Sequence, residues 1–227
     1  MKLAKPASRG DQTREALILA ALEVFGRNGY DAASTRAIAE AAGVNQALIG
    51  YHFGGKHGLY LGVFEHIVAR MRRHLAPAAA AVERALADAP GDEAGRRQFA
   101  LQMILRVFDS FIDMIGQREA AGWVRLIIRE QQEPTEAFQL LWDGMLARMM
   151  ELLNRLLAMA SGLDASSDAC RIRSLMLLGQ VLMVHIARAS TARHLGRAFS
   201  GPDDLATFKE QFYLVLHSQF SQAVPQS

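Results

Sequence analysis

Apolar residues recur along nearly the whole chain at the three- and four-residue spacing of an amphipathic helix, and no useful length alternates as a strand does. Glycine, proline and short polar runs divide this pattern into about nine or ten helices. We therefore predict an all-α protein. The predicted helices cover residues 11–28, 34–43, 45–53, 56–76, 93–115, 118–131, 135–160, 167–189 and 203–221.

Capping residues define the first helices most clearly. Asp11 is a candidate N-cap for the first helix, which is expected to stop at Gly29. Ser34 is a candidate N-cap for the second helix, and Gly43 is its expected C-terminal glycine. The fourth helix is expected to end before Pro77, because proline is unfavourable inside a helix.

The same breaks predict two domains. Residues 1–56 form a three-helix headpiece preceded by a flexible arm, 1–10, and residues 57–227 form a larger helical domain. No internal repeat of 20–50 residues marks a solenoid.

Residues 34–56, STRAIAEAAGVNQALIGYHFGGK, contain two short helices joined by a tight turn at Gly43. Such a pair is a helix-turn-helix, whose second helix usually enters the DNA major groove with its N-terminal residues. The headpiece is therefore predicted to bind DNA.

A rotation of 100° per residue assigns the faces of the second helix of this pair. If Ile49 and Phe53 point inward, Leu48 and Tyr51 point outward, and Gln46 lies at the helix start. Glutamine can read adenine through two hydrogen bonds, and a leucine can contact a thymine methyl group.

The remaining candidates suit the phosphate backbone. Thr35 and Arg36 open the first helix of the pair, where free amides also favour an anion. Tyr51, His52 and Lys56 lie toward the far end, where contacts would hold the backbone. Each has an ordinary alternative: Arg36 could pair with Glu40, His52 with its own helix backbone, and Tyr51 and Lys56 could simply be solvated.

The charge distribution agrees with this location. The net charge is only +2, from 25 basic and 23 acidic residues, which by itself does not indicate a nucleic-acid partner. Residues 1–56 contain seven basic and five acidic residues, so the whole excess lies in the headpiece.

Residues 10–65, from TREALILAALEVFGRNGY to GGKHGLY, resemble the TetR family of bacterial transcriptional regulators. The run REQQEPTEAF, 129–138, resembles the C-terminal domain of the CecR-like branch of that family. The resemblance implies an all-α homodimer with an effector-binding C-terminal domain. It also implies DNA contacts at Thr35, Arg36, Gln46, Leu48, Tyr51, His52 and Lys56.

The second domain is unusually apolar. Hydrophobic residues make up 51% of the chain, and eight of the ten methionines lie in 103–183. Methionine and aromatic walls adapt to varied ligands, although they also build ordinary cores. The expected effector-binding residues are Phe108, Phe111, Trp123, Arg129, Met145 and Met149.

Three charged residues, Arg125, Arg129 and Glu130, lie in an otherwise apolar helix of this domain. They either orient a ligand or form buried or interface ion pairs.

Two helices of this domain, 167–189 and 203–221, are too apolar for surface helices, and the second carries an apolar stripe along one face. We predict that they form a dimer interface, as a four-helix bundle would. The stripe contains Leu205, Phe208, Phe212, Leu216 and Phe220.

Other classes of protein lack support in the sequence. The longest apolar run, 175–187, is shorter than the roughly 20 residues that a bilayer requires. The segment GYHFGGKH, 50–57, resembles a phosphate-binding P-loop, but His57 replaces the hydroxyl that would bind Mg²⁺. No HExxH or GxSxG motif occurs. We expect no metal, no cofactor, no membrane span and no enzymatic activity, and the single cysteine, Cys170, fits the reducing cytoplasm.

These observations together predict a homodimeric transcriptional repressor that leaves a palindromic operator when a small apolar or amphipathic effector binds. The alternatives are an effector-independent DNA-binding regulator or activator and, more remotely, an all-α small-molecule carrier or enzyme.

Overall fold

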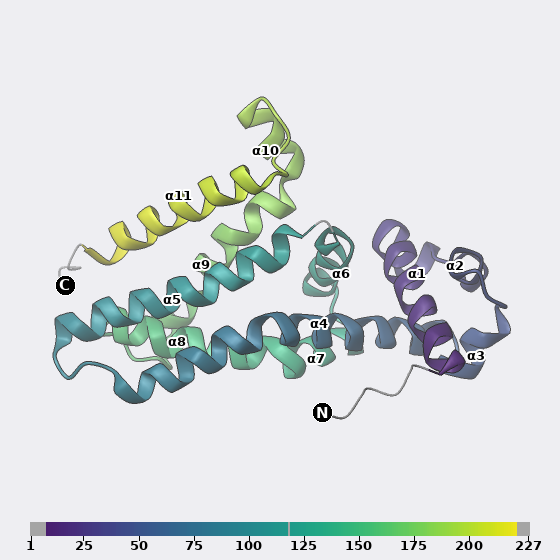
Figure 1. Ribbon diagram of the computed structural model, residues 1–227, viewed down its shortest axis with the longest axis horizontal. Coiled ribbons are helices and arrows are strands. Elements are labelled where there is room, and N and C mark those ends of the chain that lie inside the picture. The colour runs from purple at the N-terminus through teal and green to yellow at the C-terminus, as the bar shows by residue number, and fades with distance from the viewer. Residues whose placement is uncertain (1–7, 118, 222–227) are drawn as a thin grey trace. The chain divides into compact units, whose positions relative to one another are not determined.

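The structure is a computed structural model that describes residues 8–117 and 119–221, and these residues contain helices and no strand (Figure 1). This confirms the predicted all-α class. A short 3-10 helix, Leu86–Asp88, follows α4, and a turn of π-helix, Trp142–Leu146, joins α7 to α8. The helices are α1 (Arg9–Ala32), α2 (Thr35–Ala42), α3 (Ala47–Phe53), α4 (Lys56–Ala85), α5 (Glu93–Gly116), α6 (Ala120–Gln132), α7 (Glu136–Leu141), α8 (Ala147–Ser161), α9 (Asp168–Ile186), α10 (Arg188–Leu195) and α11 (Pro202–Ser221).

The chain packs as two compact units. The N-terminal unit contains Met1–Arg70 and Ala121–Gly144, and the C-terminal unit contains Met71–Ala120 and Met145–Ser227. The beginning of α4 and nearly all of α6 and α7 therefore pack with the helix-turn-helix, whereas the boundary expected from sequence lies after residue 56. A division of function at residue 56 stays a prediction.

The first helix begins earlier than the sequence indicated. Ser8, not Asp11, is the N-cap of α1, and the two residues form a capping box in which each side chain accepts from the other's backbone N–H. Asp11 was a plausible cap because it does stabilise the helix start, but from inside the first turn. Residues 1–7 of the predicted flexible arm lie outside the described residues, and Arg9 and Gly10 belong to α1.

The end of α1 has a bend at Gly29. This residue has φ 82° and ψ 174°, a conformation that essentially only glycine adopts, and helical residues continue beyond it to Ala32. The predicted stop at Gly29 is thus a change of direction that leads into α2. The predicted caps of α2 are confirmed, since Ser34 accepts from the Ala37 N–H and Gly43 is left-handed at φ 66°.

Three other predicted boundaries are wrong. Helix α4 continues through Pro77 to Ala85, because helix-forming alanines follow the proline and the next turns are held by Val82, which is fully buried. The predicted helix 135–160 is divided by the π-helical turn into α7 and α8. The predicted helix 167–189 ends at Ile186, and a separate helix, α10, occupies part of an expected loop.

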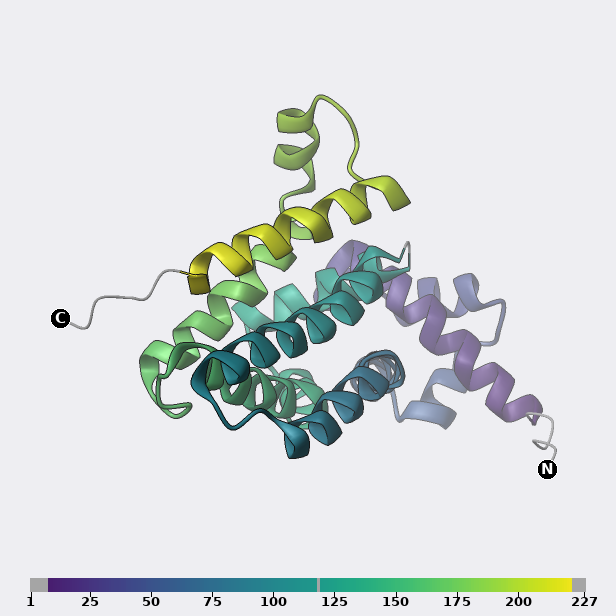
Figure 2. The ribbon, with the colours of Figure 1, turned by 60° about the vertical axis from the view of Figure 1, so that its left-hand side comes forward.

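The C-terminal unit is built on α5. This helix packs against α8 and α11, which lies beside it in both ribbon views (Figures 1 and 2), while α9 packs on α8 and α10 packs on α9. Buried side chains line much of α5, including Ile104, Phe108 and Ile112. At the edge of the α5–α11 contact, Lys209 Nζ lies 2.8 Å from a carboxylate oxygen of both Asp109 and Asp113.

Among the described residues, no single helix has the length and apolar composition to cross a bilayer. One bent pair, Asp168–Val184 with Arg188–Leu195, passes that test jointly across a 67° bend.

Candidate DNA-binding site

The helix-turn-helix is held by a small apolar core and a tight glycine turn. Ile38 of α2 and Ile49 of α3 are fully buried, and the face assignment predicted this for Ile49. Phe53, which the same assignment expected to point inward, is half-buried. The left-handed Gly43 lets its own N–H and that of Val44 bond to carbonyls in the last turn of α2. Asn45 then bonds through its side chain to the Ala47 N–H, 2.8 Å away, so a fixed geometry separates α2 from α3.

Gln46 and Thr35 meet across the turn. Gln46 Nε2 donates to Thr35 Oγ1 over 2.8 Å, which joins the N-terminus of α3 to that of α2. Both predicted contacts therefore lie at one edge of the motif. The Gln46 amide nitrogen carries two N–H donors, so one can stay bonded to Thr35 while the other, together with Oε1, reads adenine. The Thr35 hydroxyl still has its own hydrogen to donate to a phosphate.

Arg36 pairs with Glu40, which is the alternative to a DNA contact that its spacing also allows. Its Nε lies 2.9 Å from Glu40 Oε1, both side chains are exposed, and this hydrogen bond raises the pKa of the guanidinium. Exposed pairs of this kind contribute little stability, so a phosphate can displace Glu40 at small cost.

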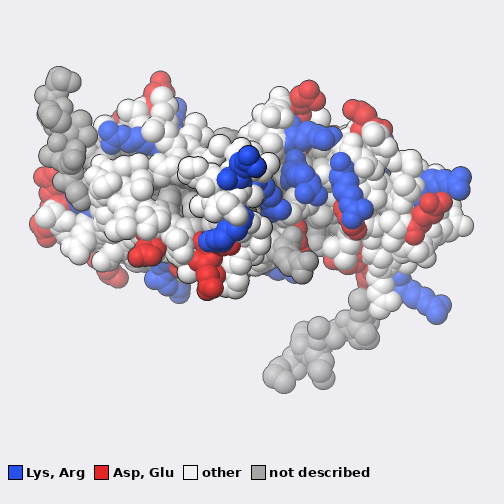
Figure 3. Space-filling model, turned by 90° about the horizontal axis from the view of Figure 1, so that it is seen from above, with Lys and Arg blue, Asp and Glu red and all other residues white. Residues whose placement is uncertain are grey.

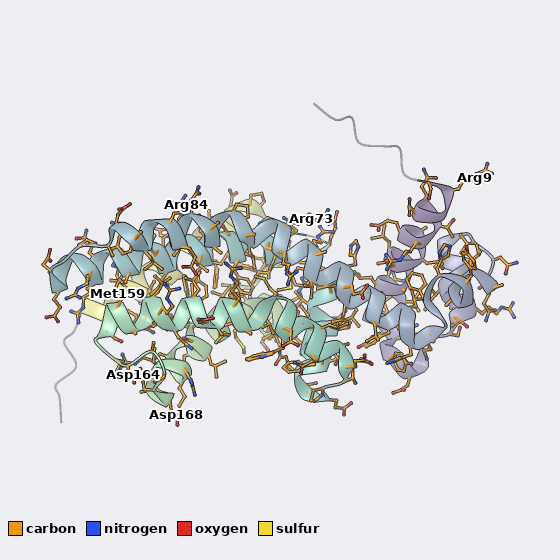
Figure 4. The ribbon with its side chains drawn as sticks, turned by 90° about the horizontal axis from the view of Figure 1, so that it is seen from below. Arg9, Arg73, Arg84, Met159, Asp164 and Asp168 are labelled. Atoms are coloured by element: carbon orange, nitrogen blue, oxygen red, sulfur yellow. The ribbon has the colours of Figure 1, made fainter. Side chains whose placement is uncertain are left out.

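Tyr51, His52 and Leu48 differ in exposure. The Tyr51 side chain is 82% exposed, which is unusual for so large a ring, and its edge meets the half-buried His52 ring at 4.9 Å. Leu48 is also half-buried. The start of α1 lies near His52: a Cβ atom on Gly10 would be 4.0 Å from His52 Cε1. Arg9, in the same turn, projects away from α1 (Figure 4).

Lys56 contacts two residues of the α1 end, unlike a lysine that is simply solvated at a helix start. Its Nζ donates to the Asp31 carbonyl over 3.1 Å and lies 4.6 Å from the centre of the Tyr30 ring. Both partners follow the bend at Gly29. No local pattern predicts this contact, because 25 residues separate Lys56 from Asp31.

The six expected effector residues fall in both units. Phe108 and Phe111 are buried on α5 with ring centroids 6.4 Å apart, and Met145 and Met149 are half-buried in the same unit. Trp123 and Arg129 belong to the N-terminal unit. Within the described residues, the Trp123 indole N–H is a buried donor without a hydrogen-bond partner. The structure does not bring all six together within one unit.

The apolar stripe predicted on α11 faces inward. Phe212 packs on Phe108 at 5.0 Å and stacks with Phe208, so these rings contribute to the core of their own chain. A different apolar surface, which the sequence reasoning did not single out by residue, runs along α9. We call it the α9 stripe: Ile172, Leu175, Met176, Met183 and Ile186, each between 49% and 59% exposed.

The charged side chains do not form one uniform basic field. On the face in Figure 3, basic and acidic residues are interspersed. In the part of the chain that the structure describes, no group of three or more His, Cys, Asp or Glu side chains is arranged to hold a metal ion.

Comparisons with known proteins agree with the helix-turn-helix. Residues 17–63 match the model of bacterial regulatory proteins of the tetR family. Residues 97–217 match the C-terminal domain of the HTH-type transcriptional dual regulator CecR. The CecR regulator of Shigella flexneri is 32% identical over 188 residues, which cover 83% of this chain and 82% of that protein. The matched proteins are transcriptional regulators, not enzymes.

Solved structures agree on the fold. A TetR-like transcriptional regulator from Rhodococcus sp. RHA1 aligns with a TM-score of 0.62 and 19% identity, and the alignment covers 95% of this chain and 100% of that chain. The FadR regulator of Bacillus subtilis, in complex with stearoyl-CoA, aligns at 0.60 and 17% identity, covering 89% and 96%. The helix-turn-helix and both sequence matches lead to one assignment: the chain belongs to the TetR family of DNA-binding transcriptional regulators and has a CecR-like C-terminal domain.

Proposed function

We propose that this regulator is a homodimeric repressor that binds a palindromic operator through Thr35, Arg36, Gln46, Leu48, Tyr51, His52 and Lys56, and leaves it when a small effector binds. The observation that carries the DNA-binding part is the bond between Gln46 and Thr35, because it joins the side chain that we propose reads a base to the one that we propose binds a phosphate. Tyr51, 82% exposed on α3, supports the proposal, because its ring is open to the DNA backbone.

The dimer is supported by the exposed apolar residues on α9. A single recognition helix reads few base pairs, and two copies spaced by about one helical turn read a palindrome. A continuous apolar stripe on one helix is a poor surface for an isolated monomer, and a symmetry-related copy would cover it with itself. A cytoplasmic location is part of the same proposal, because an operator lies on the chromosome.

The effector is proposed to be apolar or amphipathic. Phe108, Phe111, Met145 and Met149 lie in the C-terminal unit, and the FadR protein of Bacillus subtilis was solved with stearoyl-CoA. For a hundredfold release, the effector must prefer the non-binding conformation by about 2.7 kcal/mol. An effector-independent regulator or an activator would instead keep its operator in the presence of all tested compounds.

The decisive experiment is an unbiased selection from random DNA, followed by titration of the selected operator at several salt concentrations. We expect a palindromic site, and we expect Lys56→Ala to reduce the salt slope by about one, because one phosphate contact is lost. Gln46→Ala should cost about 1–3 kcal/mol on the operator and relax the preference at one base pair.

Two outcomes would contradict the proposal. Failure to select any sequence would remove operator binding altogether. An equal loss of affinity by Gln46→Ala on operator and random DNA would remove base reading by Gln46. Gln139→Ala, a neutral change at an exposed residue of α7 in the N-terminal unit, serves as the control and should leave the binding curves unchanged.

A further inference from the structure

Residues 129–138 have no assigned role as a segment in the proposed function. Within the N-terminal unit they contact α1 and α4, the helices that flank the helix-turn-helix. We propose that Glu130 and Arg129 are positioning residues, which hold the end of α1 and the start of α4 so that Thr35 and Lys56 meet DNA in a fixed arrangement. This inference rests on the proposed DNA binding, and it chooses between the two roles that the sequence left open for these charged side chains.

Glu130 is a buried carboxylate with a full set of donors. It is 2% exposed, and it accepts from the Tyr60 hydroxyl over 2.8 Å and from both the backbone N–H and the hydroxyl of Thr135 over 2.9 Å. A buried carboxylate without such partners would be strongly unfavourable, so the three donors are held in place together. Glu130 thereby fixes α4, through Tyr60, to the start of α7, which Thr135 caps.

Tyr60 transmits this contact to the helix-turn-helix. Burial and the bond to Glu130 raise the pKa of its hydroxyl, which therefore stays a donor at all ordinary pH values. Its ring meets the rings of Phe25 at 5.1 Å and Tyr30 at 4.9 Å, both on α1. The Tyr30 ring in turn faces the Lys56 ammonium, so a displacement of Tyr60 alters the support of a proposed phosphate contact.

Arg129 acts on the bend of α1. A Cβ atom on Gly29 would lie 1.5 Å from Arg129 Nη1, so the guanidinium occupies the space that any side chain at Gly29 would need. One turn earlier, Arg125 Nε donates to the Gly26 carbonyl over 2.9 Å. The bend directs the chain through Ala32 to Ser34 and Thr35, where α2 begins. Two arginines of α6 thus hold the segment that sets the position of α2.

The outer end of the same segment contacts α4 as well. Glu136 Oε2 lies 3.2 Å from His57 Nε2, next to Lys56, and both side chains are exposed. Contacts from residues 129–136 therefore reach α1 at Gly29 and α4 at both His57 and Tyr60. A segment with only a packing role would not need polar contacts on both sides of the helix-turn-helix.

The test compares two matched variants in the full-length protein. Tyr60→Phe removes only the hydroxyl that bonds to Glu130, and Tyr213→Phe removes the hydroxyl that bonds to Asp109 in the C-terminal unit. Operator affinity and its salt slope are measured well below the melting temperature of each variant. We expect Tyr60→Phe to weaken operator binding about three- to tenfold and to lower the salt slope, and Tyr213→Phe to change neither.

Glu130→Gln gives a second measurement, since it removes the charge at nearly constant shape and should weaken operator binding in the same direction. The inference is overturned if Tyr60→Phe binds the operator as the wild type does, or if both tyrosine variants lose affinity in proportion to their loss of melting temperature. A wild-type protein that selects no operator would instead overturn the proposed function itself, so the two failures are distinguishable.

Discussion

The N-terminal and C-terminal units present opposite kinds of surface. Among the described residues, the exposed large apolar side chains of the N-terminal unit are Leu19, Tyr51 and Trp142, scattered over separate elements. The described part of the C-terminal unit exposes eight, all on α9, α10 and α11. Isolated apolar residues are normal on a monomer, whereas a continuous stripe indicates a surface that is covered in use.

The interiors differ in the same way. In the N-terminal unit, hydrogen bonds from Arg125 and to Glu130 join elements far apart in the sequence. In the C-terminal unit, α11 meets α5 through the rings of Phe108 and Phe212, and Lys209 and Tyr213 bond to Asp109 at the partly exposed edge of the same contact. Directional bonds between buried groups fix one geometry, as a DNA-reading surface requires, and apolar contacts tolerate adjustment, as the proposed ligand-responsive domain would require.

The largest expected effect comes from a charge in the α9 stripe. Met176 is 59% exposed, so Met176→Asp should leave the fold of the monomer intact but place two carboxylates in the proposed interface. We expect monomers in sedimentation and an operator affinity lower by about 100-fold or more, since each monomer reads only a half-site.

Gln102→Asp, on an exposed position of α5 in the same unit, is the control and should stay dimeric. A dimeric Met176→Asp protein would place the interface elsewhere and would remove the main difference between the two units. Leu178 and Leu182, which also lie within the predicted interface range, are half-buried, so changes there would also disturb the monomer.

The second prediction concerns the bend in the N-terminal unit. Gly29→Ala forces a side chain into a conformation that costs about 1–3 kcal/mol, and its methyl group would displace Arg129. Gly162→Ala in the C-terminal unit is a matched change at φ 72° with nothing within 4 Å of the new Cβ, and it should cost only about 1–2 kcal/mol.

Chemical denaturation measures both variants. In an Arg129→Ala background the cost of Gly29→Ala should fall, because the clash is gone. An unchanged cost in that background would mean that Arg129 does not hold the bend, and would leave the hydrogen bond from Arg125 to Gly26 as the contact of α6 with the end of α1.

How far the sequence predicted these features depends on the range of the interactions. Ser34 and Gly43 were assigned correctly because a cap and a left-handed glycine act on their own helix. Pro77 was misread because its local cost is outweighed by the alanines after it and by the burial of Leu75 and Val82. The π-helical turn has no local signal either, and Val68, more than 70 residues before Gly144, packs directly against it.

The candidate site also separates into features set by local sequence and features set by contacts between distant residues. The outward position of Tyr51 followed from helical rotation and that of Gln46 from the expected helix start, but the Gln46–Thr35 bond and the Lys56–Asp31 bond join residues of different elements. The α11 stripe was correctly identified as apolar, and its direction was not, since Phe212 faces α5. A pattern gives the face of a helix, and only the packed chain decides what that face meets.

The third prediction concerns the acid stability of the start of α11 in the C-terminal unit. Asp204 accepts from the backbone N–H groups of Ser200 and Gly201 at the start of α11, and together with Arg197 they lower the pKa of its carboxyl to about 2 from 3.8. Because the folded pKa lies below the unfolded value, the unfolded state binds more protons between these values. The stability that Asp204 contributes is therefore complete above about pH 4 and is lost as the pH falls toward 2.

Denaturation midpoints recorded from pH 5 to pH 2 check this expectation, with circular dichroism at neutral pH as the control for folding. Asp204→Asn should be less stable than the wild type at neutral pH and should lose less stability across the acid range. Parallel acid curves for the two proteins would show that the start of α11 does not depend on this carboxylate.

The smallest effects are expected from a pair of glycines that tests the comparison directly. Gly50 on α3 and Gly179 on α9 are both exposed and helical, and a Cβ atom on either would meet nothing within 4 Å in the isolated chain. Alanine is favoured over glycine in a helix by about 1 kcal/mol, so both substitutions should stabilise an isolated monomer. Gly179, however, lies between Met176 and Met183 on the α9 stripe, where a second copy of the chain is proposed to approach.

We therefore expect opposite signs from one chemical change. Gly50→Ala should raise the melting temperature of the free protein by about 2–4 °C and leave the dimer unchanged, because it adds a helix-favouring methyl group outside the α9 stripe. Gly179→Ala should weaken the dimer in sedimentation, because the glycine allows the closest approach of the two backbones. If Gly179→Ala stabilises the protein as Gly50→Ala does and leaves the dimer unchanged, the two helices present equivalent surfaces at these positions, and the α9 stripe is not closely packed against a partner.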